Sequence, residues 1–192
     1  WRGGWPGDGW RHGTWRAGGV VGGVMVGEHG ETSRRRMVVL LDKRQRSYPG
    51  PEAFEAAADC AASVVVAALR AGLHVSLQAC DGAAIGGSEA SLGTQAFLDR
   101  LAETQLTDSP SLGFAIDRLR VRRLGDTLVV FTGDDGDADV ASVASLRGMY
   151  PSILVGLLGQ RATHTSSDAG MLVISATSAE NFAAAWAGVR SW

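Results

Sequence analysis

Acidic side chains follow two apolar runs of this 192-residue chain, where strand ends are expected. Asp42 follows the apolar run 37–41, and Asp134 and Asp135 follow the apolar run 127–131. In an open α/β sheet, ligands bind just beyond the carboxyl ends of the strands. The three carboxylates are therefore predicted to gather at a binding edge of the sheet.

The same edge could hold either a metal ion or a set of paired charges. Carboxylates and hydroxyls, here from Thr132 or Ser47, are the oxygen ligands that Mg²⁺ prefers. The residues that follow Asp42, however, carry positive charges that could neutralise the carboxylates without a metal: Lys43, Arg44 and Arg46. We therefore expect an acid–base network here, with metal binding at Asp42 and Asp134 as the alternative.

A small serine hydrolase is a further alternative. Ser88, Asp134 and His164 occur in the chain order of the α/β-hydrolase triad. In that fold the nucleophile sits at the strand-to-helix turn itself, whereas several residues separate Ser88 from the expected strand end at Ala79. Ser88 is more simply explained as the N-cap of the next helix. We therefore expect no complete catalytic set and no enzymatic activity.

Composition narrows the function further. The formal net charge of −2 gives no general attraction to nucleic acid or to an anionic membrane. Cys60 and Cys80 lack metal-type spacing and are expected to be buried free thiols. No stretch approaches the roughly 20 apolar residues that span a bilayer. Because the chain begins at Trp1 and not at Met, a membrane anchor before this residue stays an alternative.

From residue 37 onward, strand signals alternate with helix signals. Strands are predicted at 37–41, 73–79, 127–131, 153–157 and 171–175, and helices from Pro51 to a stop at Gly72, at 89–104, at 110–122, at 137–147 and after an N-cap at Ser178. This alternation is typical of a Rossmann-like α/β fold, a mainly parallel sheet with helices on both faces. We assign it to a domain at 37–192.

Residues 1–36 differ in composition and are predicted to form an irregular arm. They hold 11 of the 26 glycines and four of the six tryptophans, Trp1, Trp5, Trp10 and Trp15. Such aromatics beside arginines could stack on single-stranded nucleic acid, but the acidic chain favours packing of the arm on its own domain. A short strand at 24–26 is expected to pair in antiparallel fashion with the strand at 37–41.

The arm resembles the signature of the bacterial "domain of unknown function 58" family. The matching residues are Pro6, Gly7, Asp8, Arg11, Trp15 and Arg16, followed by a second block that ends at Glu28. The strand that ends at Asp42, the Ala-rich helix after it and the segments 128–132 and 182–186 are similar to a von Willebrand factor A-like domain. Such domains bind a cation through Asp-x-Ser-x-Ser, of which this chain keeps only Asp42, with Asp134 a looser match to a later Asp.

The resemblance implies a protein–protein interaction module without a cofactor. Its members are typically anchored at the bacterial membrane through an N-terminal part that this chain lacks, which implies the cytoplasmic side of the membrane, or the cytoplasm if this chain is the whole product. Their genes often neighbour a MoxR-type AAA ATPase, which is therefore the implied partner. The expected binding face consists of charged residues at the strand ends: Asp42, Lys43, Arg44, Arg46, Asp134 and Asp135.

Overall fold

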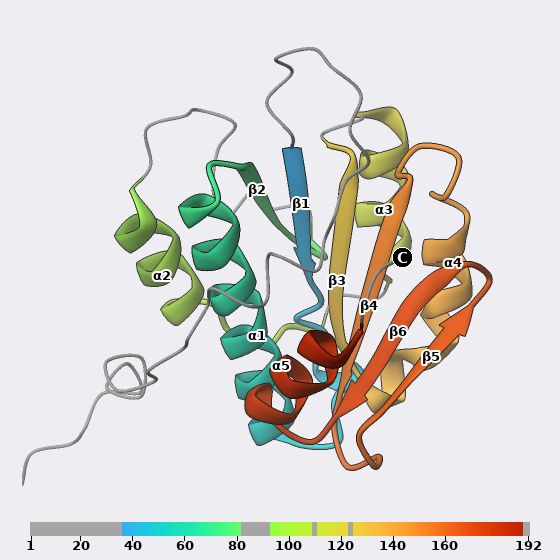
Figure 1. The fold of residues 1–192 in the computed structure, drawn as a ribbon. Helices are drawn as coiled ribbons and strands as arrows, with labels where there is room; N and C mark the ends of the chain where they lie inside the picture. Colours follow the sequence, from blue (N-terminus) through green and yellow to red (C-terminus); the bar gives the residue numbers. More distant parts are fainter. Residues whose placement is uncertain (1–35, 82–92, 109–110, 123–124, 190–192) are drawn as a thin grey trace, which may run out of the picture.

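The computed structural model describes residues 36–81, 93–108, 111–122 and 125–189, which form a three-layer α/β fold (Figure 1). Within these residues one sheet has the strand order β2-β1-β3-β4-β6-β5. Its strands are β1 (Arg36–Leu41), β2 (His74–Ala79), β3 (Thr127–Gly133), β4 (Ser152–Leu158), β5 (His164–Asp168) and β6 (Met171–Ala176). All neighbouring strands are parallel except β5, which runs antiparallel to β6. The predicted Rossmann-like architecture is confirmed.

Helices cover both faces of the sheet. One face packs against α1 (Pro51–Arg70), α2 (Thr94–Ala102) and α5 (Ala179–Gly188), and the other against α3 (Gly113–Val121) and α4 (Val140–Ala144). Pro51 begins α1, as predicted, and the Ser178 hydroxyl caps α5 by accepting a hydrogen bond from the Asn181 N–H at 3.2 Å. None of the helices among the described residues has the length and apolarity needed to cross a membrane.

Strand β1 lies between β2 and β3 because both of its faces are apolar. Met37, Val39 and Leu41 belong to the core under α1 and α5, whereas Val38 and Leu40 belong to the core under α3 and α4. A continuous apolar run is the pattern expected for a parallel strand covered on both faces. The burial of this strand fixes the position of Asp42, the residue that follows it.

Three expectations about the elements need correction. Both edges of β1 are occupied by β2 and β3, so the antiparallel pairing expected for residues 24–26, which lie outside the described residues, is not made. The helix expected at 137–147 is shorter, because a 3-10 turn, η3 (Asp134–Asp139), precedes α4. The helix α2 begins at Thr94 among the described residues, rather than at 89.

Strand β5 was missed by the sequence patterns because it contains no apolar residue. All five of its residues are exposed, so neither an apolar run nor an alternation marks it. A two-residue turn, Ala169 and Gly170, joins it to β6, and both residues have positive φ, 46° and 73°. Positive φ at both positions is typical of the type I′ turn that matches the twist of a β-hairpin.

We expect that Gly156 of β4 cannot be replaced without loss of stability. A Cβ there would lie 2.6 Å from the ring of Phe131 and 3.0 Å from that of Phe182, two rings in edge-to-face contact with centroids 5.2 Å apart. Gly156→Ala should lower the free energy of unfolding by about 1–3 kcal/mol through overpacking, measured by urea denaturation. The control is Gly148→Ala, where a Cβ meets nothing within 4 Å. Equal stability of both variants would contradict this account.

Candidate functional site

The site lies where the chain leaves β1 at the carboxyl end of the sheet. The Asp42 N–H donates a hydrogen bond to the carbonyl of Phe131 at 2.8 Å, so the ladder between β1 and β3 continues one residue past the strand. The Asp42 side chain is fully buried as a result. Burial of a charged carboxylate costs free energy unless the carboxylate is paired with another group. The group that pairs with Asp42 therefore determines whether its oxygens are available to a ligand.

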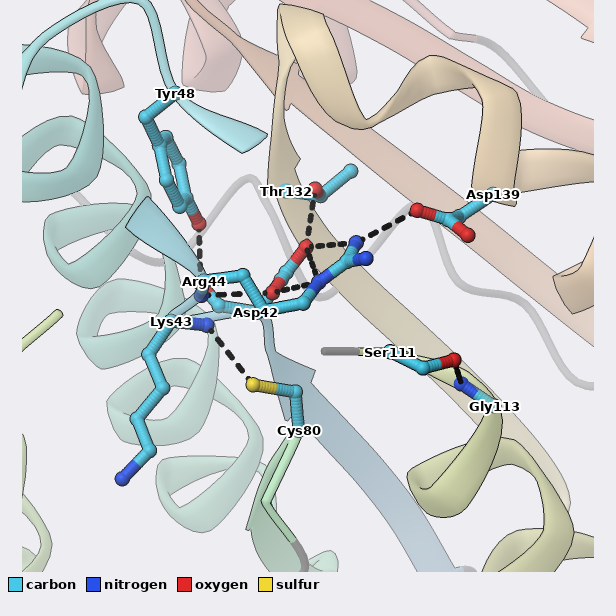
Figure 2. Close-up of polar contacts among 9 residues, drawn as sticks. All are labelled: Asp42, Lys43, Arg44, Tyr48, Cys80, Ser111, Gly113, Thr132 and Asp139. Carbon is cyan, nitrogen blue, oxygen red and sulfur yellow. Dashed lines mark hydrogen bonds and ion pairs between the residues drawn. The ribbon is translucent and has the colours of Figure 1, made fainter. Parts of the chain in front are cut away.

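The partner is Arg44, two residues further along the chain (Figure 2). Its Nε donates to Asp42 Oδ1 at 2.9 Å and its Nη2 donates to Asp42 Oδ2 at 2.7 Å, a bidentate pair. Its backbone N–H also donates to Asp42 Oδ1 at 3.0 Å. Arg44 is only 1% exposed, so the whole pair lies beneath the surface.

Three further side chains complete a closed network around this pair. The Thr132 hydroxyl donates to Asp42 Oδ2 at 2.8 Å, and Arg44 Nη2 also donates to Asp139 Oδ2 at 2.8 Å. The Tyr48 hydroxyl donates to the carbonyl oxygen of Asp42. The network thus joins the loop after β1 to the end of β3 and to the turn η3.

The electrostatics of the pair favour two charged groups. Burial would raise the pKa of the Asp42 carboxyl, but the hydrogen bonds and charge of Arg44, with a smaller contribution from Thr132, outweigh burial and lower this pKa below its ordinary value. Burial likewise disfavours the charged form of Arg44, but Asp42 and Asp139 raise its pKa. The site is therefore a permanent ion pair at neutral pH.

Two glycines allow the end of β3 and the turn after it to lie in close contact with the loop after β1. A Cβ at Gly133 would lie 2.1 Å from the carbonyl oxygen of Ser47, and a Cβ at Gly136 would lie 2.3 Å from the Thr132 hydroxyl oxygen. Each glycine lets the end of β3 and η3 pack directly against the 3-10 turn η2 (Gln45–Ser47). The sequence Thr132-Gly133-Asp134-Asp135-Gly136 thus positions the network sterically.

Asp134 forms a second, separate contact with the loop after β4. Its Oδ2 accepts hydrogen bonds from the backbone N–H groups of Gln160, at 2.6 Å, and Arg161, at 3.0 Å. Its buried Oδ1 has no hydrogen-bond partner within the described part of the chain. Asp134 therefore holds the 160–161 loop, a contact separate from the Asp42–Arg44 pair.

The structure divides the predicted binding face into buried and exposed members. Asp42, Arg44 and Asp134 are buried, whereas Arg46 and Asp135 are exposed. The half-buried Lys43 pairs with Asp81, their Nζ and Oδ2 lying 2.6 Å apart, and its N–H faces Cys80 Sγ at 3.4 Å. Both cysteines, Cys60 and Cys80, are buried and free, as expected.

Other predicted residues lie elsewhere. Ser88 and the signature residues between 6 and 28 fall outside the described residues, so the serine triad and the signature are not placed. His164 lies on the exposed strand β5, where its Nδ1 is 3.0 Å from the carbonyl oxygen of Ala162. Sequence reasoning missed two members of the network, Asp139 and Tyr48. No local pattern reports a contact that spans 95 residues, as Arg44–Asp139 does, and the hydrogen bond from Tyr48 depends on the fold of the loop after β1.

The side chains present do not fit a divalent cation at Asp42. Both of its carboxylate oxygens already accept hydrogen bonds, and the Arg44 guanidinium supplies the positive charge that a bound cation would bring. Arg44 and Arg46 stand where the Asp-x-Ser-x-Ser pattern has hydroxyls. Across the described ranges, no cluster of three or more His, Cys, Asp or Glu side chains could hold a metal ion.

Comparisons with known proteins add little to this geometry. No protein-family model matches the chain, and no curated protein matches it either. The crystal structure of the Deinococcus radiodurans RO (RSR) protein is similar, with 21% sequence identity and a TM-score of 0.45. The match covers 80% of this chain but 34% of that one, so this chain corresponds to about a third of that protein's length. A likeness this distant carries no argument about function.

Removing one partner of the ion pair should destabilise the protein far more than removing both. Arg44→Met leaves the buried Asp42 charge without its partner and should lower the free energy of unfolding by about 3–5 kcal/mol. The double variant Asp42→Asn/Arg44→Met removes both charges, and its loss should be less than half as large. Urea denaturation of both variants and the wild type measures the difference. A double variant that is as unstable as Arg44→Met, or less stable, would contradict this account.

The lowered pKa of Asp42 also predicts a pH dependence. A carboxyl group with a lower pKa in the folded state stabilises the protein above its unfolded pKa of about 3.9, and this stabilisation is lost as pH falls through the folded pKa. The wild type should therefore lose stability relative to Asp42→Asn/Arg44→Met below about pH 4, with a constant difference above about pH 5. Urea denaturation from pH 3 to pH 7 tests this expectation, and parallel stability curves for the two proteins would refute it.

Proposed function

We propose that this chain is a non-enzymatic protein-binding module with a von Willebrand factor A-like fold, which binds its partner at the carboxyl end of its sheet. The observation that supports the proposal is the bidentate Asp42–Arg44 pair. In this pair the buried carboxylate at the end of β1 binds the guanidinium of the protein itself. The oxygens of Asp42 that could ligate a cation or transfer a proton are all hydrogen-bonded. The site is therefore suited to holding the loop after β1 and the turn η3 in one arrangement at the surface.

The surface held by this pair, which we call the rim face, consists of Lys43, Gln45, Arg46 and Asp135. Gln45, Arg46 and Asp135 are exposed, and Lys43 is half-buried. The positive residues belong to the loop after β1 and Asp135 belongs to η3, so the rim face carries charges of both signs from two segments. Mixed charges on a fixed backbone favour specific recognition of a partner with the complementary pattern.

The resemblance of residues 5–28 to the "domain of unknown function 58" signature suggests the partner. Genes of that family often neighbour the gene of a MoxR-type AAA ATPase, and we propose such an ATPase as the protein that binds the rim face. The role of the complex would be the assembly or maturation of a larger complex. The buried members of the expected face, Asp42, Arg44 and Asp134, would then position the exposed ones without contacting the partner themselves.

The alternatives have weaker support. Metal-dependent ligand binding would require a cation to displace the Arg44 guanidinium from Asp42. The bidentate hydrogen bonds between the two residues and the burial of Arg44, which is 1% exposed, oppose this exchange. Asp134 Oδ1, which is buried and has no partner in the described ranges, is the one observation that favours an ion nearby. A serine hydrolase would require His164 to contact both Asp134 and Ser88, a residue outside the described ranges.

Reversal of the charge at Arg46 should weaken binding of the ATPase. The chain, its Arg46→Glu variant and its Arg70→Glu variant are immobilised, and binding of the MoxR-type AAA ATPase of the same organism is measured by biolayer interferometry. Arg46→Glu should weaken binding at least tenfold, whereas Arg70→Glu, an exposed position at the opposite end of α1, should not. Binding should also persist in EDTA, which an adhesion-type metal site would not allow. Equal binding by all three chains would exclude the rim face.

A further inference from the structure

The strand β5 forms one edge of the sheet, and β6 is its one strand neighbour among the described residues. It ends the strand order, so no strand among the described residues pairs with its outer edge (Figure 1). All five of its residues are exposed, and the exposed stretch extends from Gln160 to Gly170. An edge strand of this kind presents a row of backbone N–H and C=O groups to any chain that can pair with it.

The turn between β5 and β6 sets which backbone N–H and C=O groups of β5 point away from β6. In a hairpin with a two-residue type I′ loop, the residues that flank the loop form a hydrogen-bonded pair, here Asp168 and Met171. Hydrogen-bonded positions alternate along an antiparallel strand, so Asp168, Ser166 and His164 direct their backbone groups toward β6. Thr165 and Ser167 therefore direct theirs toward the outer edge.

We propose that this edge pairs in antiparallel fashion with β5 of a second copy of the chain, about a two-fold axis at Ser166. In this register each Thr165 lies opposite the second copy's Ser167, so the two outward-facing residues of one strand meet the two of the other. Ser166 then lies opposite Ser166 of the second copy. The pairing joins the two sheets into one continuous sheet across the dimer.

The side chains of β5 are complementary to themselves in this register. His164 lies opposite Asp168 of the second copy, and Asp168 lies opposite the other His164, so the two ends of the interface carry the same pair. Both pairs occupy non-hydrogen-bonded positions, where facing Cα atoms approach to about 4.5 Å and side chains interact most strongly. His164 is the only residue of β5 that can carry a positive charge, and Asp168 is its only acid.

The strand also lacks three features that commonly block edge pairing, a lysine, a proline and a bulge. It contains no lysine and no proline, and its pairing with β6 runs without a bulge from His164 to Asp168. Its side chains are short and polar, which suits a weak and reversible contact. Five paired residues bury far less than the 1,200–2,000 Å² typical of stable complexes, so we expect a dissociation constant on the order of 100 µM.

Sedimentation equilibrium of the full chain from about 10 µM to 1 mM, at pH 6, tests the proposal. The wild type should dimerise, and Thr165→Pro, which removes an outward-facing N–H without touching the β6 ladder, should abolish the dimer. His164→Glu places two like-charged pairs in the interface and should weaken the dimer about tenfold, as should Asp168→Lys. Asp99→Lys, a charge reversal on the exposed side of α2, should have no effect.

The double variant His164→Glu/Asp168→Lys gives the decisive result. It exchanges the two charges, so each Glu again faces a Lys of the other copy, and dimerisation should recover to the wild-type level or above. Circular dichroism of each variant confirms that the fold is retained. A wild type that stays monomeric at 1 mM would overturn the proposal. So would a dimer that survives Thr165→Pro, or a double variant no better than either single variant.

Discussion

The buried ion pair between Asp42 and Arg44 is the interaction on which the carboxyl end of the sheet depends. It satisfies a carboxylate that β1 places in the interior, and through Thr132, Tyr48 and Asp139 it ties three segments together. A buried pair of this kind contributes less net stability than its short distances suggest, because both charges lose their hydration. Its larger effect is to define one arrangement of the loops, since any other arrangement leaves a charge buried without a partner.

This pair also determines which groups the carboxyl end of the sheet presents to solvent. In open α/β proteins the strand ends are where ligands usually gather, and here that position is filled by the protein's own guanidinium. The backbone segments that carry the exposed Arg46 and Asp135 are joined by the network below them. For the proposed partner, the backbone of this surface is already arranged before binding, which lowers the conformational entropy lost on binding.

The sequence predicted the fold well where burial leaves a pattern and poorly where it does not. The apolar runs marked β1 and β3, and Pro51 and Ser178 marked helix starts, because each reflects a local physical cause. The expectation of an acid–base network at Asp42 followed from cations next to a strand-end acid. The polar strand β5 and the contribution of Asp139 gave no local signal, because one depends only on pairing with β6 and the other on tertiary packing.

The order of the strands in the sheet differs from their order in the chain, and this affects how the protein folds during synthesis. The unit formed by β1, α1 and β2 is complete by residue 79, but the second neighbour of β1 is β3, which begins at Thr127. While the ribosome still holds the later segment, one edge of β1 has no partner among the described strands, and Asp42 lacks the hydrogen bond from Thr132, 90 residues further along the chain. A nascent chain at this stage exposes an apolar strand edge, so a chaperone that shields it would raise the yield of native protein.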